Sequence, residues 1–226
     1  MGRRVGFFAL CVAIASMIGC GGGTDTTQQL RIVMASPDAP PVDILIDGSQ
    51  VGTALAYTNS TAYLSVKTGS HRVEALTVSN STSVFQQEIS VTASANQTLL
   101  LTGPVAHMDS VLLTDGTTTT TTIDTSKGQV RVVNASPAMG TADVYIVNAG
   151  TSISGTKPAA SNLAVNQASA YQLENIGNFQ VFMTAPGTYS VYLNSGPLAL
   201  TQSQFLTVVA VNGVGGGFNY ILLTDQ

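Results

Sequence analysis

A seven-residue sequence occurs twice in this chain, and it sets the organisation of the residues between. Residues 31–37 read Arg-Ile-Val-Met-Ala-Ser-Pro, and residues 131–137 read Arg-Val-Val-Asn-Ala-Ser-Pro. Each copy begins with the apolar run of a β-strand. The Ser-Pro pair then forces an extended or turning backbone that cannot stay in a hydrogen-bonded ladder. The repeat therefore predicts two equivalent strands, each of which opens a domain.

The match between the two copies continues beyond this opening. Asp43 recurs as Asp143, 100 positions later, whereas Ala62-Tyr63 recurs as Ala170-Tyr171, 108 positions later. The eight added residues lie within Asn148–Ala160, a stretch with Gly, Ser and Pro that is typical of a longer loop. Both copies also close on Leu-Leu-Thr-Asp. Since loops tolerate insertions and strand registers do not, the pattern predicts a duplicated domain in which each copy buries its own core.

Many short strands are predicted in each copy. Charged residues make up only 9% of the chain, and a polar surface of Thr, Ser, Asn and Gln suits strands and turns better than helices. Asp47-Gly48, between two apolar runs, predicts a tight hairpin turn, and Thr68-Gly69-Ser70 predicts another. The strands expected in the first copy span residues 30–35, 42–46, 50–55, 61–67, 70–78, 84–91, 97–102 and 110–114. This pattern predicts an all-β fold of two tandem β-sandwiches.

The domain boundaries follow from the repeats and from a change of composition. The first sandwich is predicted over residues 30–115 and the second over residues 129–226. Residues 116–128 include six consecutive threonines and have no core pattern, so they are predicted to be a linker. The alternative is that the threonines extend an edge strand.

The first 19 residues have the features of an export signal. Arg3 and Arg4 precede an uncharged apolar run from Val5 to Ile18, which ends at Gly19-Cys20. A membrane-spanning helix is the alternative, but the run is shorter than the ~20 apolar residues that a span needs. We predict a signal peptide over residues 1–19. It resembles the bacterial lipoprotein type, in which Cys20 becomes the lipidated first residue of the mature protein.

Lipidation of Cys20 would tie the protein to a membrane of the cell envelope. Residues 20–29 are small and polar, so they are predicted to form a flexible tether. Gly21 and Gly22 stand where an inner-membrane retention signal would place an aspartate. In a two-membrane bacterium the outer membrane is therefore favoured, and both its periplasmic and its surface face stay open. Cys11 leaves with the signal, so no disulfide is expected in the mature chain.

The repeated opening, the strands that follow it and one turn together resemble a known family. The relevant stretches are Arg31–Pro37 and Arg131–Pro137, Val42–Ile46 and Ala142–Ile146, and Ala185–Val191. They are similar to the domain-of-unknown-function family 4397, exported bacterial modules that often occur in tandem. The resemblance covers nearly the whole mature chain. It implies an immunoglobulin-like sandwich with no assigned activity.

Charge and motifs limit the function classes. The formal net charge is −4, with 8 basic and 12 acidic residues, and an acidic chain is a poor partner for nucleic acid. The sequence has no nucleophile elbow, zinc-protease motif or phosphate-binding loop with its lysine. We therefore expect no enzyme, no catalytic residue, no cofactor and no metal site.

Two histidines are candidates for chemistry, but each has a simpler interpretation. Aligning Gly69 with Gly187 puts His71 opposite Tyr189, so His71 is interpreted as a half-buried replacement for an aromatic side chain with one hydrogen-bond partner. A ligand or general-base role is the alternative. His107 follows Gly103-Pro104 and is predicted to lie in a surface loop.

The acidic residues near the first strand are interpreted structurally. A calcium site would need several converging oxygens, but the spacing of Asp38, Asp43 and Asp47 does not fit a compact loop. Because Arg31 and Asp43 recur together as Arg131 and Asp143, we predict an arginine–aspartate pair within each sandwich that fixes its first strand against its second.

Function is expected in the loops that differ between the copies. The leading hypothesis is a non-enzymatic, lipid-anchored envelope protein that binds an unknown protein or glycan, or mediates adhesion, through Asn148–Ala160 and Gly213–Gly217. The glycine-rich stretch lacks the features of a phosphate loop and is predicted to connect two strands as a hairpin. A structural scaffold of the envelope is the alternative, and a carbohydrate-active or other enzyme is the third class.

Overall fold

The computed structural model describes residues 2, 26–116 and 126–225, and within them the chain is all β apart from one short 3-10 turn, Val105–His107. The predicted signal peptide and the lipidation site Cys20 therefore lie outside the described residues, except for Gly2. Most of the predicted tether and linker lies outside them as well. Within residues 26–116 and 126–225, no helix is long and apolar enough to span a membrane.

The first half forms a two-layer sandwich. Its strands are β1 (Thr27–Met34), β2 (Val42–Ile46), β3 (Ser49–Leu55), β4 (Leu64–Lys67), β5 (Gly69–Thr77), β6 (Ser83–Val91), β7 (Gln97–Thr102) and β8 (Asp109–Thr114). One sheet has the order β3-β2-β5-β6 and the other β4-β1-β7-β8, with β1 parallel to β7. Asp47 and Gly48, both at positive φ, form the predicted two-residue hairpin. Only Thr68 separates β4 from β5, which belong to different sheets, so this turn is a crossing between layers and not a hairpin.

The second half repeats this arrangement. Its strands are β9 (Lys127–Asn134), β10 (Ala142–Asn148), β11 (Ala160–Leu163), β12 (Gln167–Ala168), β13 (Gln172–Asn175), β14 (Gly177–Thr184), β15 (Val191–Leu200), β16 (Phe205–Asn212) and β17 (Phe218–Asp225). One sheet has the order β11-β10-β14-β15. In the other, β9 pairs with β12 and β13 on one side and with β16, in parallel, on the other, and β17 completes the sheet. The predicted all-β fold class, two tandem β-sandwiches, is confirmed.

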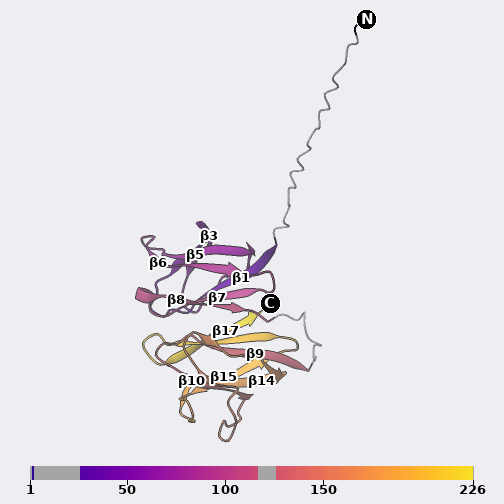
Figure 1. Ribbon diagram of the computed structural model, residues 1–226. Helices are drawn as coiled ribbons and strands as arrows, with labels where there is room; N and C mark the ends of the chain where they lie inside the picture. Colours follow the sequence, from indigo (N-terminus) through magenta and orange to yellow (C-terminus); the bar gives the residue numbers. More distant parts are fainter. Residues whose placement is uncertain (1, 3–25, 117–125, 226) are drawn as a thin grey trace.

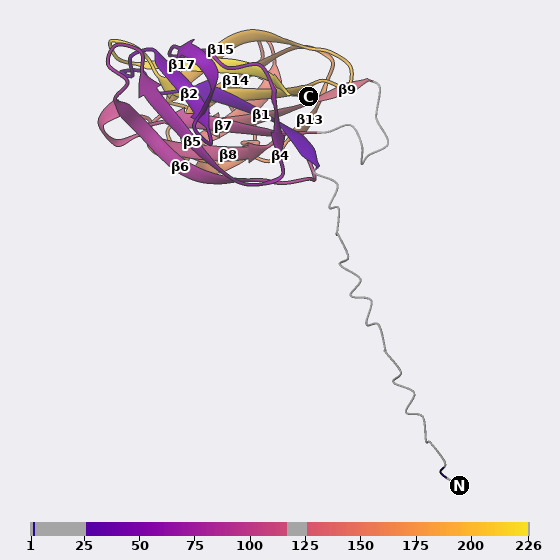
Figure 2. The same cartoon turned by 90° about the horizontal axis from the view of Figure 1, so that it is seen from above.

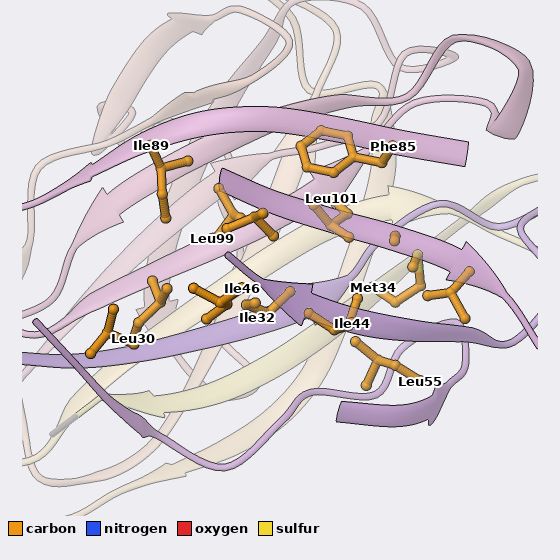
Figure 3. Packing of buried hydrophobic residues seen from close by; sticks show 14 of the residues in the cluster. Leu30, Ile32, Met34, Ile44, Ile46, Leu55, Phe85, Ile89, Leu99 and Leu101 are labelled. Atoms are coloured by element: carbon orange, nitrogen blue, oxygen red, sulfur yellow. The ribbon is translucent and has the colours of Figure 1, made fainter. Parts of the chain in front are cut away.

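Period-two alternation explains how the repeated opening builds these layers. In β1, Leu30, Ile32 and Met34 point into the core of the first sandwich, where they meet Ile44 and Leu99 (Figure 3). Neighbouring residues on a strand point to opposite faces. The intervening Arg31 and Val33 therefore leave that core, yet both are buried. Something else must cover the outer face of β1.

The second sandwich covers it. A separate buried cluster takes apolar residues from both halves, and its members are Val33, Ala35, Leu100, Leu113, Val133, Ala135, Val209, Val211, Ile221 and Leu223. The sheet that contains β1 therefore packs on the sheet that contains β9. The molecule is a stack of four sheets: these two lie in the middle, and the sheets that contain β2 and β10 lie on the outside (Figures 1 and 2). Each copy has its own core, as predicted, but the two copies also share one.

Two strands begin earlier than the sequence predicts. β1 begins at Thr27, within the predicted tether, and β9 begins at Lys127, within the predicted linker. The polar residues of β1 pair with β4, with Thr27 opposite Lys67 and Gln28 opposite Val66. Backbone pairing at this sheet edge needs no apolar side chain, so the hydrophobic pattern did not reveal it.

Candidate functional site

The predicted pairs of Arg31 with Asp43 and of Arg131 with Asp143 are wrong, because the nearest carboxylate to each arginine belongs to the other sandwich. Arg131 Nη2 also lies 3.6 Å from Asp225 Oδ2 of its own sandwich. Arg31 Nη2 donates to Asp225 Oδ1 at 2.6 Å, and Arg131 Nη2 donates to Asp115 Oδ1 at 2.7 Å. Asp43 lies on the outer sheet of the first sandwich and is not a partner of Arg31. Arg31 lies on the opposite sheet, on the face turned away from the core, so the two side chains point away from each other.

The two crossed pairs have matching surroundings. Arg31 lies over the ring of Tyr63 at 4.7 Å, and Arg131 lies over the ring of Tyr171 at 4.6 Å. Each arginine also donates to a threonine on its neighbouring strand and to the carbonyl oxygen before the partner aspartate. The tyrosine hydroxyls donate to the two aspartates at 2.7 and 2.6 Å. The cluster is a buried, charge-balanced junction between the sandwiches.

Burial affects the titration of this junction. Burial is the largest cause that raises the pKa of Asp115, and the nearby charge of Asp225 adds to it, while the hydrogen bonds from Tyr63 and Thr98 oppose it. Burial is also the largest cause that raises the pKa of Tyr63 and of Tyr171 above the ordinary value of 10.0. The polar groups of the junction are already occupied by one another, so it is a structural feature and not an open site.

Asp43 and Asp143 instead fix a bulge in each outer sheet. Asp43 Oδ1 accepts a hydrogen bond from Ala54 N at 2.9 Å, and Asp143 Oδ1 accepts one from Asn162 N at 2.7 Å. Ala54 and Asn162 both have positive φ, 49° and 55°, where the β2–β3 and β10–β11 registers shift. A side-chain acceptor at such a position compensates for the interrupted ladder. This role explains why the aspartate occurs in both copies.

An open pocket lies on the outer sheet of the second sandwich. The loop 149–159 joins β10 to β11, where the first sandwich has only the two-residue turn Asp47-Gly48. Ile153 of this loop is buried in a small cluster with Tyr145 and Val147 of β10, so the loop folds back over the outer face of its own sheet. The pocket forms between this loop and the turn 185–190 that joins β14 to β15.

The pocket has a volume of about 380 Å³ and is open to solvent. It is lined by Asp143, Tyr145, Thr156, Pro158, Ser161, Asn162, Gly187, Thr188 and Tyr189. Asp143 is the one charged side chain in this lining. Its second carboxylate oxygen, Oδ2, accepts a hydrogen bond from Gly187 N at 2.7 Å, so Asp143 links β11 to the turn 185–190 across the pocket.

Two tyrosines form the aromatic part of the pocket. Tyr145 is only 4% exposed, whereas Tyr189 is 51% exposed, and their ring centroids lie 6.2 Å apart at a tilt of 46°. The Tyr189 hydroxyl accepts a hydrogen bond from Gly155 N at 3.0 Å. Burial raises the pKa of Tyr145, and the nearby Tyr189 and Asp143 add to this shift. Tyr189 presents this aromatic wall to solvent, and Tyr145 supports it from below.

The strand registers correct the alignment used for His71. Asp43 lies opposite Leu76, and Asp143 lies opposite Thr184, so β5 and β14 match with Gly69 on Gly177. This match puts His71 on Phe179, and not on Tyr189. His71 therefore does occupy the position of an aromatic residue. That residue, Phe179, does not line the pocket, so His71 does not correspond to any pocket residue.

His71 has two hydrogen-bond partners and not the single one predicted. Its Nδ1 lies 2.6 Å from Asp47 Oδ2, and its Nε2 lies 2.8 Å from the carbonyl oxygen of Lys67. The hydrogen bond to His71 is the largest cause that lowers the pKa of Asp47. These contacts fix the β2–β3 hairpin to the layer crossing after β4, which is a structural role.

The remaining sequence candidates do not meet at a common site. His107 ends the exposed turn after Gly103-Pro104, and Asp38 accepts hydrogen bonds from Ser36 and from the backbone of Val105. Gly213–Gly217 connects β16 to β17 as the predicted hairpin loop, with Val214 exposed at its tip. Among residues 26–116 and 126–225, no three His, Cys, Asp or Glu side chains are grouped so that they could hold a metal ion.

A family model described as a domain of unknown function, DUF4397, matches the chain twice, over residues 28–145 and 128–226. The chain belongs to the DUF4397 family. The first match covers the first sandwich and continues through β9 into β10, and the second match covers the second sandwich, consistent with the tandem arrangement that the sequence resemblance predicted. The family carries no assigned activity, and no curated protein matches this DUF4397 chain.

Solved structures resemble the DUF4397 tandem only distantly. The Bacillus anthracis TIE protein matches with a TM-score of 0.26 and 12% identity over 82% of this chain, which spans about a third, 33%, of that protein's length. A family CBM26 module from Eubacterium rectale Amy13K, solved with maltoheptaose, matches with a TM-score of 0.30 and 13% identity over 88% of this chain and 98% of the module. TM-scores this low carry no argument about the function of the DUF4397 chain.

Proposed function

We propose that this protein is a non-catalytic binding protein of the cell envelope, anchored by lipid on Cys20, that holds its ligand in the pocket of the second sandwich. The supporting observation is the way in which the pocket is built. Its lining comes from β10, from β11, from the turn 185–190, and from the loop 149–159, which the first sandwich lacks. The element that most distinguishes the two copies therefore forms one side of the cavity, through Thr156 and Pro158.

The chemistry of the lining supports binding and not catalysis. A general acid or base needs a titratable group that can exchange a proton with the substrate. The one carboxylate of the lining, Asp143, is buried, and each of its two oxygens already accepts a backbone hydrogen bond at 2.7 Å. The other lining side chains are hydroxyl, phenol, amide or apolar groups. Such a set can recognise a ligand without transforming it.

Filling the pocket tests the proposal. Ser161 is exposed in the lining, so a Ser161→Tyr side chain would occupy the cavity without removing a core contact. Ser79, exposed in the β5–β6 turn of the first sandwich, supplies the matched control Ser79→Tyr. We expect immobilised wild-type protein and the Ser79→Tyr variant to retain the same envelope components from an extract, and Ser161→Tyr to lose them. Equal retention by all three proteins would exclude the pocket as the binding site.

A scaffolding role is the second candidate, and the junction between the sandwiches favours it. A shared apolar layer and two crossed ion pairs join the halves, as expected for a stiff spacer. A spacer requires no pocket, so its contribution to envelope integrity should survive Ser161→Tyr. Protease added to whole cells separates the two possible orientations, because only surface-exposed protein is cut.

A further inference from the structure

We propose that the pocket of the second sandwich binds a neutral oligosaccharide, with one sugar ring lying against Tyr189. The inference deepens the proposed function and depends on it. Four features of the pocket carry it: a pre-positioned aromatic ring, free uncharged polar groups, an unfavourable environment for charged ligands, and an open shape.

Tyr189 is exposed and yet held in place. Half of its surface is open to solvent, its hydroxyl is bound to Gly155 N, and its ring leans on Tyr145. An aromatic side chain whose position is already fixed loses little conformational freedom when a ligand covers it. The C–H face of a sugar ring is an apolar surface of suitable size for such a ring.

Uncharged hydrogen-bonding groups surround the ring. Thr156, Ser161 and Asn162 are exposed members of the lining. Within the described part of the chain, their side chains form no hydrogen bond with other protein groups. Two hydroxyls and one amide can each donate and accept, which matches the hydroxyls around a sugar ring. Leaving these groups unpaired costs nothing while water reaches them, so the free pocket is stable.

The charges around the pocket disfavour ionic ligands of either sign. The carboxylate of Asp143 repels phosphate, sulfate and acidic sugars at short range. Its two backbone hydrogen bonds already compensate much of its charge, and the exposed Lys157 lies between two lining residues in the chain. Both features reduce the attraction for a cation. A neutral, hydroxyl-rich ligand satisfies the lining best.

The size and openness of the pocket indicate a unit of a chain. A volume of about 380 Å³ lies at the lower end of the ~300–1,000 Å³ typical of small-molecule sites. Because the pocket is open to solvent, neighbouring sugar units can extend past the rim. We therefore expect an oligosaccharide to bind more tightly than its monosaccharide.

The test uses the full chain purified in detergent and a panel of neutral tetrasaccharides built from glucose, galactose, mannose or N-acetylglucosamine. Sialylated and sulfated oligosaccharides form the anionic arm, and tetramethylammonium forms the cationic arm. Binding is measured by calorimetry. The variants are Tyr189→Ala, Tyr189→Phe, which keeps the ring, and Tyr192→Ala, which removes an exposed tyrosine outside the pocket. Circular dichroism verifies that each variant is folded.

At least one neutral tetrasaccharide should bind, and Tyr189→Ala should weaken it by about tenfold or more, while Tyr189→Phe and Tyr192→Ala keep most of the affinity. Failure of every neutral saccharide to bind, or equal binding by Tyr189→Ala and wild type, would overturn the proposal. Tyr189-dependent binding of only an anionic or cationic probe would also overturn it, but the proposed binding role of the pocket would stand. Loss of retention in Ser161→Tyr tests that role separately.

Discussion

Arg31 of β1 lies 2.6 Å from Asp225 at the end of β17, so the first strand of one sandwich is bonded to the last strand of the other. Arg131 of β9 repeats the contact with Asp115, the residue after β8. Every member of each pair is buried. The duplicated opening sequence is thus part of an interface between its own two copies.

Removing one arginine should strongly destabilise the protein. Arg31→Met leaves Asp225 buried without its main partner, and breaking a buried pair costs about 3–5 kcal/mol. Arg72, which is exposed and lies 3.4 Å from Glu74, provides the control, because an exposed pair contributes about 0–1 kcal/mol. Urea unfolding measures both losses. If Arg31→Met costs no more than Arg72→Met, the crossed pair does not stabilise the fold.

The junction should also make the protein sensitive to alkali. Burial raises the pKa of Tyr63 and Tyr171 above 10.0, so above this pH the unfolded chain loses protons that the folded chain keeps. Stability from these groups is complete below pH 10 and falls as the pH rises towards the folded-state values, by at most about 1.4 kcal/mol per pH unit for each tyrosine. Urea unfolding above pH 10 should show a shallower decline in a Tyr63→Phe/Tyr171→Phe variant. Tyr192→Phe, outside the junction, should decline as the wild type does.

The two bulge aspartates should differ in their contribution to stability. Asp43 accepts one backbone hydrogen bond, and Asp143 accepts two, one from Asn162 of β11 and one from Gly187 of the turn 185–190. With ~1–3 kcal/mol for each backbone group left unsatisfied, Asp143→Ala should cost about twice as much as Asp43→Ala. Paired denaturation curves provide the measurement. Equal costs would show that the Gly187 contact contributes nothing.

The lipid anchor predicted at Cys20 has its own test. The wild-type protein should fractionate with membranes, because an acyl chain gains about 0.8 kcal/mol for each buried methylene. Cys20→Ala should appear in the soluble fraction, with Ser16→Ala in the predicted signal peptide as a control. A Cys20→Ala protein that still sediments with membranes would contradict the proposal.

Strand positions were the most predictable part of the fold. Residues 42–46 and 97–102 are strands at the predicted bounds, and several others differ by one residue, because apolar alternation and turn residues act locally. The bulges were not foreseen. A bulge depends on which residue lies opposite, as with Asp43 and Ala54, and this information is not contained in one strand.

The partners of the arginines could not be deduced from repetition alone. A repeat shows that Arg31 and Asp43 are both retained, but two residues can be retained for separate reasons. One sequence feature did contain the answer: Ile32, Val33 and Met34 are consecutive apolar residues, and a strand with both faces apolar is covered on both sides. The tyrosines of the repeated Ala-Tyr sequences, Tyr63 and Tyr171, and the aspartates that end the repeated Leu-Leu-Thr-Asp sequences, Asp115 and Asp225, are the other members of the junction.

The pocket was only partly predictable. The insertion within Asn148–Ala160 located one side of the pocket, and Ala185–Val191 was predicted to be a turn. Matching Gly69 to Gly187 aligned this turn with the start of β5, so nothing in the sequence placed it beside the insertion. Tyr145 stands where the first copy has Leu45, a change that does not reveal whether the ring is covered. Only the structure shows that the loop 149–159 packs on Tyr145 and leaves the ring of Tyr189 exposed to solvent.

The crossed pairing has a consequence for the order in which this protein can mature. The ribosome synthesises the first sandwich first. The ion-pair partner of Arg31, however, is Asp225, which ends the last strand to be synthesised. Until β17 joins its sheet, Arg31 lacks the carboxylate of Asp225, and the shared apolar layer lacks Ile221 and Leu223. The first sandwich is therefore completed only when the last strand is in place, and a chain that stops before β17 leaves Arg31 without its carboxylate partner and the shared apolar layer incomplete.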